Sequence, residues 1–474
     1  MSAPSDDRRG GPWSGRRLHF IGVGGAGMSG YARAAQALGA QLSGSDGADS
    51  PFLARLREDG VLAASIGHDA ANIPAGADVE VIYSSAVPAA NPERAAARER
   101  GLSERPRAAL LAELTALKRT IAIAGTHGKT TTSAMLVHAL RHQGELDPSW
   151  LIGAAIGGGL PNAHWGAGEL LVVEADESDR SMLSLDVEIA VLTNVELDHH
   201  ATFGSLRELR EAFREFLARA RCGVVVWDRP ELLELAPAAA GDPARSTAVE
   251  PAAPAVEVVP YDVPAPLLDA GGSSFRWREH EVRLRVPGAH NALNAAGALE
   301  AARLVGADIE SAIAGLADFR GAGRRFQPVG ASRGGAAIYE DYAHHPTEVE
   351  ATLRAARTLV HRRLVAVFQP HLFSRTALLC AEFARALALA DVVAVLDVYP
   401  ARERAADYPG VSGLLIAQAV ADAARGGAIY WLPTFADAEP ALDALLGEGD
   451  LCLVMGAGNV DELARRLATG SDGG

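Results

Sequence analysis

The segment IAIAGTHGKTTTSAML, residues 121–136, constrains the fold more than any other part of the chain. It begins with the β-branched and small apolar residues typical of a buried strand, passes through glycines, and continues in a pattern typical of a helix. Glycines at a strand-to-helix turn let several N–H groups converge on a phosphate, and the helix N-terminus adds positive potential. The segment therefore predicts an α/β domain with a phosphate-binding loop.

Individual residues of this loop have distinct expected roles. Lys129 is placed to reach the outer phosphates of a nucleotide, and the Thr130 hydroxyl is placed to ligate Mg²⁺. The loop is shorter than the common G-x-x-x-x-G-K-[ST] pattern, because Ile123 stands where that pattern has its first glycine. A plain glycine turn is the alternative, but the strand before the loop and the helix after it favour a nucleotide site. The predicted ATP-binding residues of the loop are Gly125, Thr126, His127, Gly128, Lys129, Thr130 and Thr131.

Strand-like and helix-like stretches alternate along most of the chain, which is typical of βαβ units and parallel sheets. At 474 residues the chain is too long for a single core. We expect an N-terminal Rossmann-like domain, a central ATP-binding domain with the phosphate loop, and a C-terminal Rossmann-like domain. The predicted bounds of these domains are 17–107, 108–322 and 323–468, with tails at 1–16 and 469–474.

Composition excludes several classes of protein. The net charge of −15 argues against a nucleic-acid partner, which would require a basic face. The three cysteines lack the spacing of a disulfide framework or thiolate metal site, which favours a cytoplasmic location. No apolar run is long enough for membrane insertion, and the first residues lack the apolar region of a signal peptide. The Pro- and Ala-rich stretch 237–257 is predicted to be a surface excursion.

Acidic and imidazole side chains follow two later strands of the central unit. Glu174 comes first after the strand in LLVVEADESD, where parallel sheets present ligand-binding groups, and it is the leading candidate for a Mg²⁺ ligand. Asp176, Glu177 and Asp179 are equally well explained as a solvated acidic loop. His199, in TNVELDHH, stands beside an aspartate at a strand end, which favours a functional site over a structural role.

The N-terminal unit carries a second glycine motif. Gly22, Gly24 and Gly27 in GVGGAG match G-x-G-x-x-G directly after a strand, and Asp46 follows at the distance of the dinucleotide fingerprint. An NAD-dependent oxidoreductase is therefore one alternative. The same physics binds any nucleoside diphosphate, however, and an NAD enzyme would not need a second phosphate loop.

The C-terminal unit concentrates polar residues at strand ends. A core would not favour the polar set in YEDYAHHPTE and FQPHLFSRT, which consists of Asp341, Tyr342, His344, His345, His371, Ser374 and Arg375. Arg325, at the entrance to this unit, suits anionic oxygens because its guanidinium forms paired hydrogen bonds. A zinc site is the competing interpretation, but paired histidines without thiolates or an HExxH motif are poor evidence for one.

Taken together and in this order, these motifs resemble the Mur ligase family over about residues 17–467. Within the family, they are most similar to the ligases that attach L-alanine to UDP-N-acetylmuramate. The matching stretches are HFIGVGGAGMSG, SGSD, GTHGKTTT, EADESD, TNVELDH, GAHNALNA, RRFQ, DYAHHPTE, QPH, SRT and MGAGN.

The resemblance implies ATP-dependent amide formation at the lactyl carboxylate, through an acyl phosphate and a tetrahedral intermediate. That reaction belongs to cytoplasmic peptidoglycan precursor synthesis, and hence to cell-wall biogenesis, cell shape and division. The implied cofactor is Mg²⁺, with Mn²⁺ as a substitute. UDP-N-acetylmuramate and L-alanine are the implied partners, and a monomer or homodimer is expected.

The resemblance also implies roles for particular residues. The UDP-sugar would be held by Gly24, Gly25, Ala26, Gly27, Met28, Ser29, Asp46, His68, Ser84, Ser85, Ala86, Asn194 and Glu196. ATP would also contact Asn291, Asn294, Arg325, Asp341 and His344, and metal ions would be bound by Thr130, Glu174 and His199. Tyr342, His371 and Arg375 would line the amino-acid pocket. The implied catalytic residues are Lys129, His199, Arg325, His344, His371 and Arg375.

Some assignments stay open at this point. Either His344 or His371 could accept the proton from the attacking amine. Ala201 stands where many members have an aspartate, and the carbamylated lysine of several sister ligases has no clear counterpart. A ligase that recycles a murein tripeptide is the nearest alternative function, and a catalytically inactive nucleotide-binding regulator is another.

Overall fold

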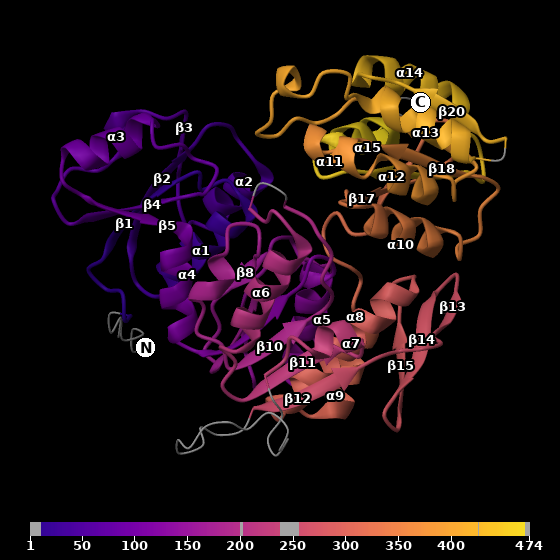
Figure 1. Cartoon of the computed structure of the whole chain (residues 1–474). Helices are drawn as coiled ribbons and strands as arrows, with labels where there is room; N and C mark the ends of the chain where they lie inside the picture. The colour runs from indigo at the N-terminus through magenta and orange to yellow at the C-terminus, as the bar shows by residue number, and fades with distance from the viewer. Residues whose placement is uncertain (1–10, 200–201, 238–255, 425, 470–474) are drawn as a thin grey trace, which may run out of the picture.

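The computed structural model describes residues 11–199, 202–237, 256–424 and 426–469 of the chain. Within these ranges, three α/β domains follow one another, from indigo through magenta to yellow in Figure 1. The expected three-domain α/β architecture is therefore confirmed. None of the helices in this part of the chain has the length and apolar character of a membrane span.

The N-terminal domain is built on a five-stranded parallel sheet in the order β3-β2-β1-β4-β5. Its strands are β1 (Arg17–Ile21), β2 (Gln41–Asp46), β3 (Ser65–Ile66), β4 (Val79–Tyr83) and β5 (Ser103–Pro106). Its helices are α1 (Ala26–Ala37), α2 (Pro51–Glu58) and α3 (Pro92–Glu99). The central place of β1, with crossovers to both sides, is typical of a Rossmann-like domain.

The predicted N-terminal tail extends too far into the chain. The Trp13 side chain is buried, with the residue only 6% exposed, and the backbone N–H of Trp13 donates to the Leu38 carbonyl at 3.0 Å. The guanidinium carbon of Arg16 lies 4.4 Å from the centre of the Trp13 ring. Residues 11–16 therefore belong to the folded domain, because burial of an aromatic side chain holds them against it. The predicted tails at 1–10 and 470–474 lie outside the described residues.

The central domain follows α4 (Arg107–Ala116) and has a seven-stranded sheet in the order β12-β11-β10-β6-β9-β7-β8, antiparallel only at β8. Its strands are β6 (Arg119–Ala124), β7 (Ser149–Leu151), β8 (Ala163–His164), β9 (Leu170–Glu174), β10 (Ile189–Leu192), β11 (Gly223–Trp227) and β12 (Glu257–Tyr261). Its helices are α5 (Lys129–Arg141), α6 (Leu206–Leu217), α7 (Pro230–Leu233), α8 (Ala289–Leu304) and α9 (Ile309–Ala317).

A separate antiparallel sheet of three strands extends from the central domain (Figure 1). It consists of β13 (Leu267–Asp269), β14 (Gly272–Trp277) and β15 (His280–Leu284). Of the stretch expected to be a surface excursion, residues 238–255 lie outside the described part of the chain.

The C-terminal domain has a six-stranded sheet in the order β16-β17-β21-β18-β19-β20, parallel except for β16. Its strands are β16 (Gln327–Ala331), β17 (Ala337–Asp341), β18 (Leu364–Phe368), β19 (Val392–Val395), β20 (Ala428–Trp431) and β21 (Leu451–Met455). Its helices are α10 (Pro346–Ala356), α11 (Phe373–Leu378), α12 (Cys380–Leu387), α13 (Gly413–Ala423), α14 (Phe435–Leu445) and α15 (Val460–Thr469).

The register of the central sheet brings the predicted site together. Strand β6 lies between β9 and β10, with Ile123 opposite Glu174 and Ala124 opposite Leu192. The segments that follow these three parallel strands therefore leave the sheet at the same edge. Helix α10 of the C-terminal domain contacts α8 of the central domain, so the two domains meet beside that edge (Figure 1).

Candidate active site

The phosphate-binding loop runs from the end of β6 to the start of α5. Gly125 and Gly128 adopt positive φ angles of +133° and +83°. A Cβ on Gly125 would lie 2.0 Å from Thr193 Oγ1, and a Cβ on Gly128 would lie 2.8 Å from Asn294 Oδ1. Only glycine satisfies both the backbone conformation and the close approach of these neighbours.

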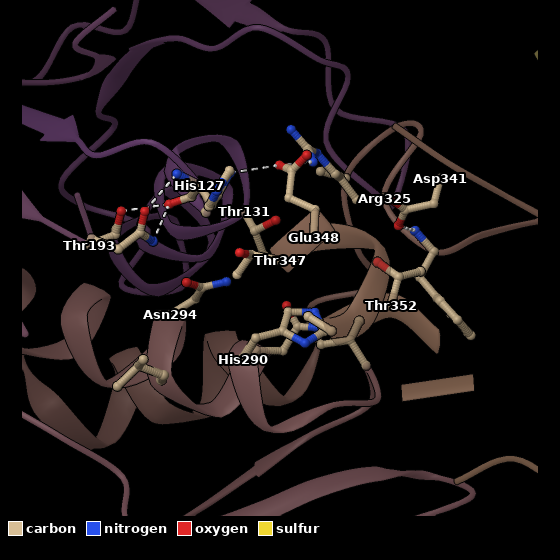
Figure 2. Close-up of a pocket in the computed structure, with 18 of the residues that line it drawn as sticks. His127, Thr131, Thr193, His290, Asn294, Arg325, Asp341, Thr347, Glu348 and Thr352 are labelled. Carbon is tan, nitrogen blue, oxygen red and sulfur yellow. Dashed lines mark hydrogen bonds and ion pairs between the residues drawn. The ribbon is translucent and has the colours of Figure 1, made fainter. Parts of the chain in front are cut away.

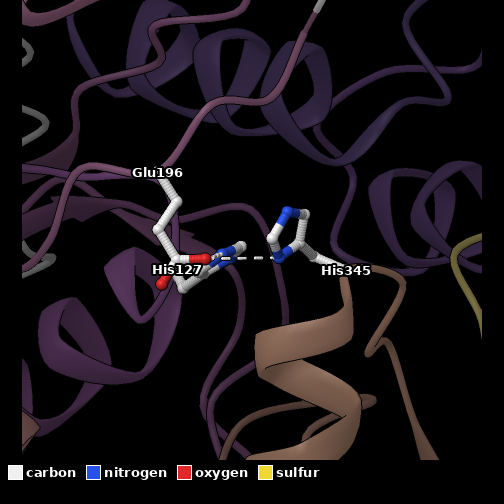
Figure 3. A group of neighbouring side chains, drawn as sticks. All are labelled: His127, Glu196 and His345. Atoms are coloured by element: carbon white, nitrogen blue, oxygen red, sulfur yellow. Dashed lines mark ion pairs between the residues drawn. The ribbon is translucent and has the colours of Figure 1, made fainter. Parts of the chain in front are cut away.

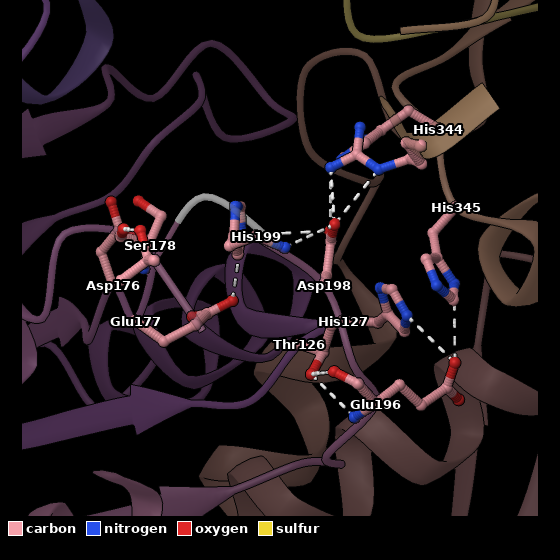
Figure 4. A network of polar contacts seen from close by, with 12 residues as sticks. Thr126, His127, Asp176, Glu177, Ser178, Glu196, Asp198, His199, His344 and His345 are labelled. Atoms are coloured by element: carbon pink, nitrogen blue, oxygen red, sulfur yellow. Dashed lines mark hydrogen bonds and ion pairs between the residues drawn. The ribbon is translucent and has the colours of Figure 1, made fainter. Parts of the chain in front are cut away.

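Lys129, the first residue of α5, faces a buried carboxylate. Its Nζ donates to both carboxylate oxygens of Glu177 at 2.9–3.0 Å and to the Gly125 carbonyl at 2.6 Å. Burial lowers the pKa of Lys129, but the charge of Glu177 outweighs burial and raises it above its ordinary value. Glu177 Oε1 also lies 3.4 Å from His199 Nε2 (Figure 4). Glu177 is thus a buried link between the loop lysine and the predicted metal histidine, not a solvated acid.

Two predicted metal ligands lie side by side. Thr130 Oγ1 donates to Glu174 Oε2 at 3.0 Å, and the Gly153 N–H donates to Glu174 Oε1 at 2.6 Å. Burial raises the pKa of Glu174, as expected for a carboxyl group that has lost water without gaining a full counter-charge. A hydroxyl and a buried carboxylate are oxygen donors of the kind that Mg²⁺ prefers. His200 and Ala201 lie outside the described residues.

A cavity of about 220 Å³ opens between the phosphate loop, α8 and the C-terminal domain (Figure 2). Seven of the predicted ATP-binding residues line it: His127, Gly128, Thr131, Asn291, Asn294, Arg325 and Asp341. Its apolar wall is made by Trp227, Tyr261, Val286, Phe319 and Phe326, which the sequence analysis did not identify. An apolar, aromatic cavity beside a phosphate loop is suited to a purine base. His344 does not line this cavity.

Asp341 and Arg325 lie at the C-terminal side of the cavity. The Asp341 carboxylate accepts the N–H groups of Phe326 and Ala343, each at 2.7 Å, so it fixes the two loops that border the cavity. Burial raises the pKa of Asp341 to about 6, against the opposing charge of Arg325. Arg325 donates to Glu348 Oε1 at 3.3 Å.

His127, in the phosphate loop, lies between two carboxylates. Its Nε2 is 3.5 Å from Glu196 Oε2, and its Nδ1 is 3.4 Å from Glu348 Oε1. Although burial lowers the pKa of His127, the charges of Glu348 and Glu196 outweigh burial and raise it to about 9. Unless a cation takes the place of its proton, this side chain therefore contributes positive charge beside the predicted phosphate site.

The predicted amino-acid residues form one cluster with His344. The Tyr342 and His344 rings are 5.2 Å apart, the His344 and His371 rings 6.0 Å, and Arg375 Nη1 lies 3.2 Å from His371 Nδ1. Arg375 is also paired with Asp198 of the central domain, which accepts three hydrogen bonds at 2.8–3.1 Å. The remaining nitrogen, Nη1, lies 3.2 Å from His371 Nδ1 and donates to the His371 carbonyl at 3.3 Å, so Arg375 also fixes the position of His371.

The glycine motif of the N-terminal domain leads into α1. The Gly24 N–H donates to Asp46 Oδ2 at 2.7 Å, and a Cβ on Gly24 would lie 2.9 Å from that oxygen. Asp46 therefore holds the glycine turn with Oδ2, while its Oδ1 accepts the Ala48 N–H at 3.4 Å; its contact with the UDP-sugar stays a prediction. Met28 and Ser29 are buried, and the Ser29 hydroxyl donates to the Ala26 carbonyl at 2.9 Å; their contact with the UDP-sugar stays a prediction.

Three family models divide the chain among them. They are described as "Mur ligase family, catalytic domain", "Mur ligase middle domain" and "Mur ligase, glutamate ligase domain", and they match residues 17–119, 123–302 and 324–458. A ligase from Nocardia farcinica, named UDP-N-acetylmuramate–L-alanine ligase, is 40% identical, with 99% of this chain and 98% of that protein aligned. The chain belongs to the Mur ligase family.

Other Mur ligases agree with this assignment. The UDP-N-acetylmuramate–L-alanine ligase of Acidothermus cellulolyticus is 45% identical over 93% of this chain and 92% of its own. The crystal structure of the UDP-N-acetylmuramate–alanine ligase from Thermotoga maritima has a TM-score of 0.78 and 26% identity, covering 96% of this chain and 98% of that one. A murein peptide ligase from Psychrobacter arcticus shares the fold, with a TM-score of 0.68 and 22% identity.

In this Mur ligase, two residues assigned to the UDP-sugar lie against the phosphate loop. Asn194 Oδ1 accepts the His127 N–H at 2.8 Å, and the Glu196 carbonyl accepts the Thr126 hydroxyl at 2.9 Å. Both residues line the cavity in which ATP is predicted to bind, here called the ATP cavity. Their contact with the sugar stays a prediction, as does that of Ser84, Ser85 and Ala86, which follow β4 near the glycine turn.

Sequence reasoning missed residues whose role depends on distant neighbours. Arg107 of α4 pairs with Asp176 and Asp179 at 2.8 Å, so those acids are not simply solvated. Asn162 of the central domain donates to the Ala26 carbonyl at 2.6 Å, at the start of α1. No local pattern marks Arg107 or Asn162, because their partners are far away in the sequence.

One missed residue supports a predicted contact. Glu93 is fully buried and accepts from His19, Ser45 and His68 at 2.7–2.9 Å. A Cβ on Gly47 would lie 3.7 Å from His68 Nε2. Glu93 thus fixes the orientation of His68 beside the end of β2, where the UDP-sugar is predicted to bind.

Proposed function

We propose that this Mur ligase joins L-alanine to the lactyl carboxylate of UDP-N-acetylmuramate at the expense of ATP, in the cytoplasmic synthesis of peptidoglycan precursors. The observation that carries the proposal is that two groups of predicted site residues, here called half-sites, meet across the boundary between the central and C-terminal domains. Lys129 and its loop come from the central domain, and the cluster of His344, His371 and Arg375 comes from the C-terminal domain, joined through Asp198. The names of full-length relatives at 40–45% identity support the same substrates.

The chemistry requires two anions to meet. The lactyl carboxylate oxygen attacks the γ-phosphorus of ATP, the bond to the β-phosphate oxygen breaks, and an acyl phosphate and ADP result. The amine then attacks the acyl carbon, a tetrahedral intermediate forms, and inorganic phosphate leaves. Lys129, Arg325 and the N–H groups of the loop stabilise the charge on the phosphoryl oxygens. Contact between the domains positions the reactants and excludes water from the acyl phosphate.

Thr130 and Glu174 would hold Mg²⁺, and His199 would reach a second ion from the loop after β10. When bound, the ion neutralises charge on the phosphates and acts as a Lewis acid. The ion would therefore act through the phosphates of ATP, and the residues that hold it need no contact with the acyl group of the substrate.

We expect Glu174→Gln to raise the Mg²⁺ concentration needed for half-maximal activity by about 10- to 100-fold. An amide keeps the acceptor for Thr130 but removes the negative charge that attracts the cation. A Mg²⁺ titration of phosphate release at saturating ATP measures the effect. Glu169→Gln, one residue before β9, is the matched control and should leave the titration unchanged. Equal Mg²⁺ requirements in wild type and Glu174→Gln would contradict the assignment.

The two candidate proton acceptors differ in their hydrogen-bond partners. His344 Nδ1 lies 2.9 Å from the Tyr342 carbonyl, which only accepts, so neutral His344 carries its proton on Nδ1 and leaves Nε2 free. His371 Nδ1 faces the Arg375 guanidinium, which only donates, so neutral His371 carries its proton on Nε2. Burial lowers the pKa of His344 to about 3, and burial with Arg375 lowers that of His371 to about 4. We therefore infer that His344 accepts the amine proton and His371 donates to the substrate.

His344→Gln should lower kcat by about 10²-fold or more, because a general base is lost. His371→Gln should mainly raise the KM for L-alanine. Since both histidines are neutral above pH 5, neither should produce an inflection in the pH profile of wild-type kcat between pH 6 and 9. Steady-state kinetics over this range checks all three expectations. A His344→Gln enzyme with wild-type kcat would overturn the role of His344.

The proposed ligase activity is tested by measuring phosphate release in a complete reaction mixture and in mixtures that each lack one component. Release should require ATP, Mg²⁺, UDP-N-acetylmuramate and L-alanine together, and the product should be heavier by one alanyl residue. Release that needs a murein tripeptide in place of L-alanine would instead identify a recycling ligase. The NAD-dependent oxidoreductase alternative loses its support, because a Mur ligase domain accounts for the same glycine motif.

A further inference from the structure

Three potential metal ligands converge from two domains beside the ATP cavity (Figure 3). His127 comes from the phosphate loop, Glu196 from the segment after β10, and His345 immediately precedes α10 of the C-terminal domain. Glu196 Oε2 lies 3.5 Å from His127 Nε2 and 3.5 Å from His345 Nδ1. One ligand atom from each residue lies within 4.8 Å of the others.

Three of the imidazole nitrogens in this cluster are buried and lie near carboxylates without making a hydrogen bond. His127 and His345 are only 9% and 6% exposed. Among the described residues, His127 Nδ1, His127 Nε2 and His345 Nδ1 have no hydrogen-bond partner. Buried polar atoms normally have a partner, and leaving one unpaired is costly. The Glu196 carboxylate is held in place by the Thr347 hydroxyl, which donates to Oε2 at 2.6 Å.

The spacing and chemistry match a tetrahedral transition-metal ion. Ligands at about 2.0–2.2 Å from Zn²⁺ lie about 3.4 Å from one another in a tetrahedron. The observed separations of 3.5 Å from Glu196 are close to that value. Two imidazoles and one carboxylate, with a fourth position left open, form a known zinc ligand set. Imidazole nitrogens favour Zn²⁺ and related ions over Mg²⁺, which prefers oxygen.

We propose that His127, Glu196 and His345 form a binding site for a transition-metal ion of the zinc class, separate from the predicted Mg²⁺ site at Thr130 and Glu174. The ion joins the phosphate loop to α10 and so ties the central domain to the C-terminal domain. Because His127 also lines the ATP cavity, an occupied site restrains the opening through which ADP and ATP exchange. Zinc bound there inhibits turnover.

Cobalt binding to the full chain tests the site directly. Co²⁺ is titrated at pH 8 without nucleotide, in the presence of excess Mg²⁺ that fills the oxygen-ligand site. Tetrahedral Co²⁺ absorbs visible light much more strongly than octahedral Co²⁺. We expect a strong visible band that saturates at one equivalent and disappears when Zn²⁺ is added. The absence of the band would overturn the proposal.

Two variants locate the ion. His345→Gln should weaken Co²⁺ binding at least about tenfold, whereas His361→Gln removes an imidazole elsewhere in the same domain and should leave it unchanged. Glu196→Gln provides a second ligand variant, and circular dichroism confirms that each protein is folded. A band of equal strength in all proteins would place the ion elsewhere and contradict the site.

Inhibition supplies an independent readout. The Zn²⁺ concentration that halves phosphate release should be at least about tenfold higher for His345→Gln than for wild type or His361→Gln. Equal inhibition of all three, relieved by added Mg²⁺, would show that zinc acts at the magnesium site. That result would refute inhibition through a zinc ion bound by His127, Glu196 and His345.

Discussion

Lys129→Ala should lower ATP-dependent phosphate release by about 10³-fold or more. The side chain is the one lysine of the phosphate loop, and a cation on the transferring phosphoryl group is worth several orders of magnitude in rate. Its ammonium is already held in the site by Glu177 and the Gly125 carbonyl, so it requires no reorganisation to act. Rapid quenching with hydroxylamine, which traps acyl phosphate as a hydroxamate, should detect no intermediate in the variant.

The chain provides a matched control for this experiment. It contains only two lysines, and the other, Lys118, donates to the carbonyls of Gly166 and Gly168 away from the phosphate loop. Lys118→Ala should therefore retain acyl phosphate formation. Removing Lys129 also leaves Glu177 buried without its partner, which typically costs about 3–5 kcal/mol of stability. Combining Lys129→Ala with Glu177→Gln removes that buried charge, and ligation by the folded double variant would refute the role of Lys129.

Local patterns were sufficient to predict which segments meet at the edge of the central sheet. The phosphate loop, Glu174 and the segment after β10 were each recognisable from a strand followed by a turn or polar residues. Because parallel strands end at the same edge of a sheet, those segments had to meet. Thr130 and Glu174 do lie within hydrogen-bonding distance, at 3.0 Å.

Long-range pairing was not predictable in this way. Glu177 stands 48 residues from Lys129, and Arg375 stands 177 residues from Asp198, so no local spacing relates the partners. Glu177 has the same sequence signature as a solvated acid, and only burial distinguishes the two. The proposed metal site of His127, Glu196 and His345 was not predictable for the same reason, because His127 and His345 come from different domains.

The fold was predictable where one residue pattern covered a whole βαβ unit. The antiparallel strands β14 and β15 lie outside the βαβ units, and in β15 only Val282 and Leu284 are buried, so the βαβ pattern does not anticipate them. Strand β16 is mostly exposed and pairs antiparallel to β17, which the parallel pattern does not anticipate. Trp13 shows the same limit, since one aromatic residue in a polar stretch gives no periodic signal.

Asp198→Asn should lower kcat/KM for L-alanine by about 10²-fold or more. Asp198 and Arg375 join the central and C-terminal domains, and their side chains are only 5% and 3% exposed. Loss of one charge leaves the Arg375 guanidinium buried without a counter-charge, which typically costs about 3–5 kcal/mol. Since each 1.36 kcal/mol corresponds to a tenfold change, a loss of that size in the productive contact predicts a change of at least about 10²-fold.

The pH dependence of this effect separates the ion pair from a titrating group. Burial raises the pKa of Asp198, but the Arg375 guanidinium outweighs burial and holds it well below its usual range. A carboxyl group with a depressed pKa contributes stability that is fully present above its ordinary pKa near 4 and is lost only on further acidification. The ratio of wild-type to Asp198→Asn kcat/KM should therefore be the same at pH 6 and pH 9.

An exposed ion pair in the same domain gives the comparison. Glu382 and Arg385 lie 3.0 Å apart with side chains 44% and 67% exposed, so Glu382→Gln should change kcat/KM less than about twofold. If Asp198→Asn is as mild as Glu382→Gln, the Asp198–Arg375 pair does not align the two half-sites. If it is severe while the KM for ATP stays near wild type, the pair acts on the amino-acid side, because Arg375 is the residue whose remaining Nη1 faces His371.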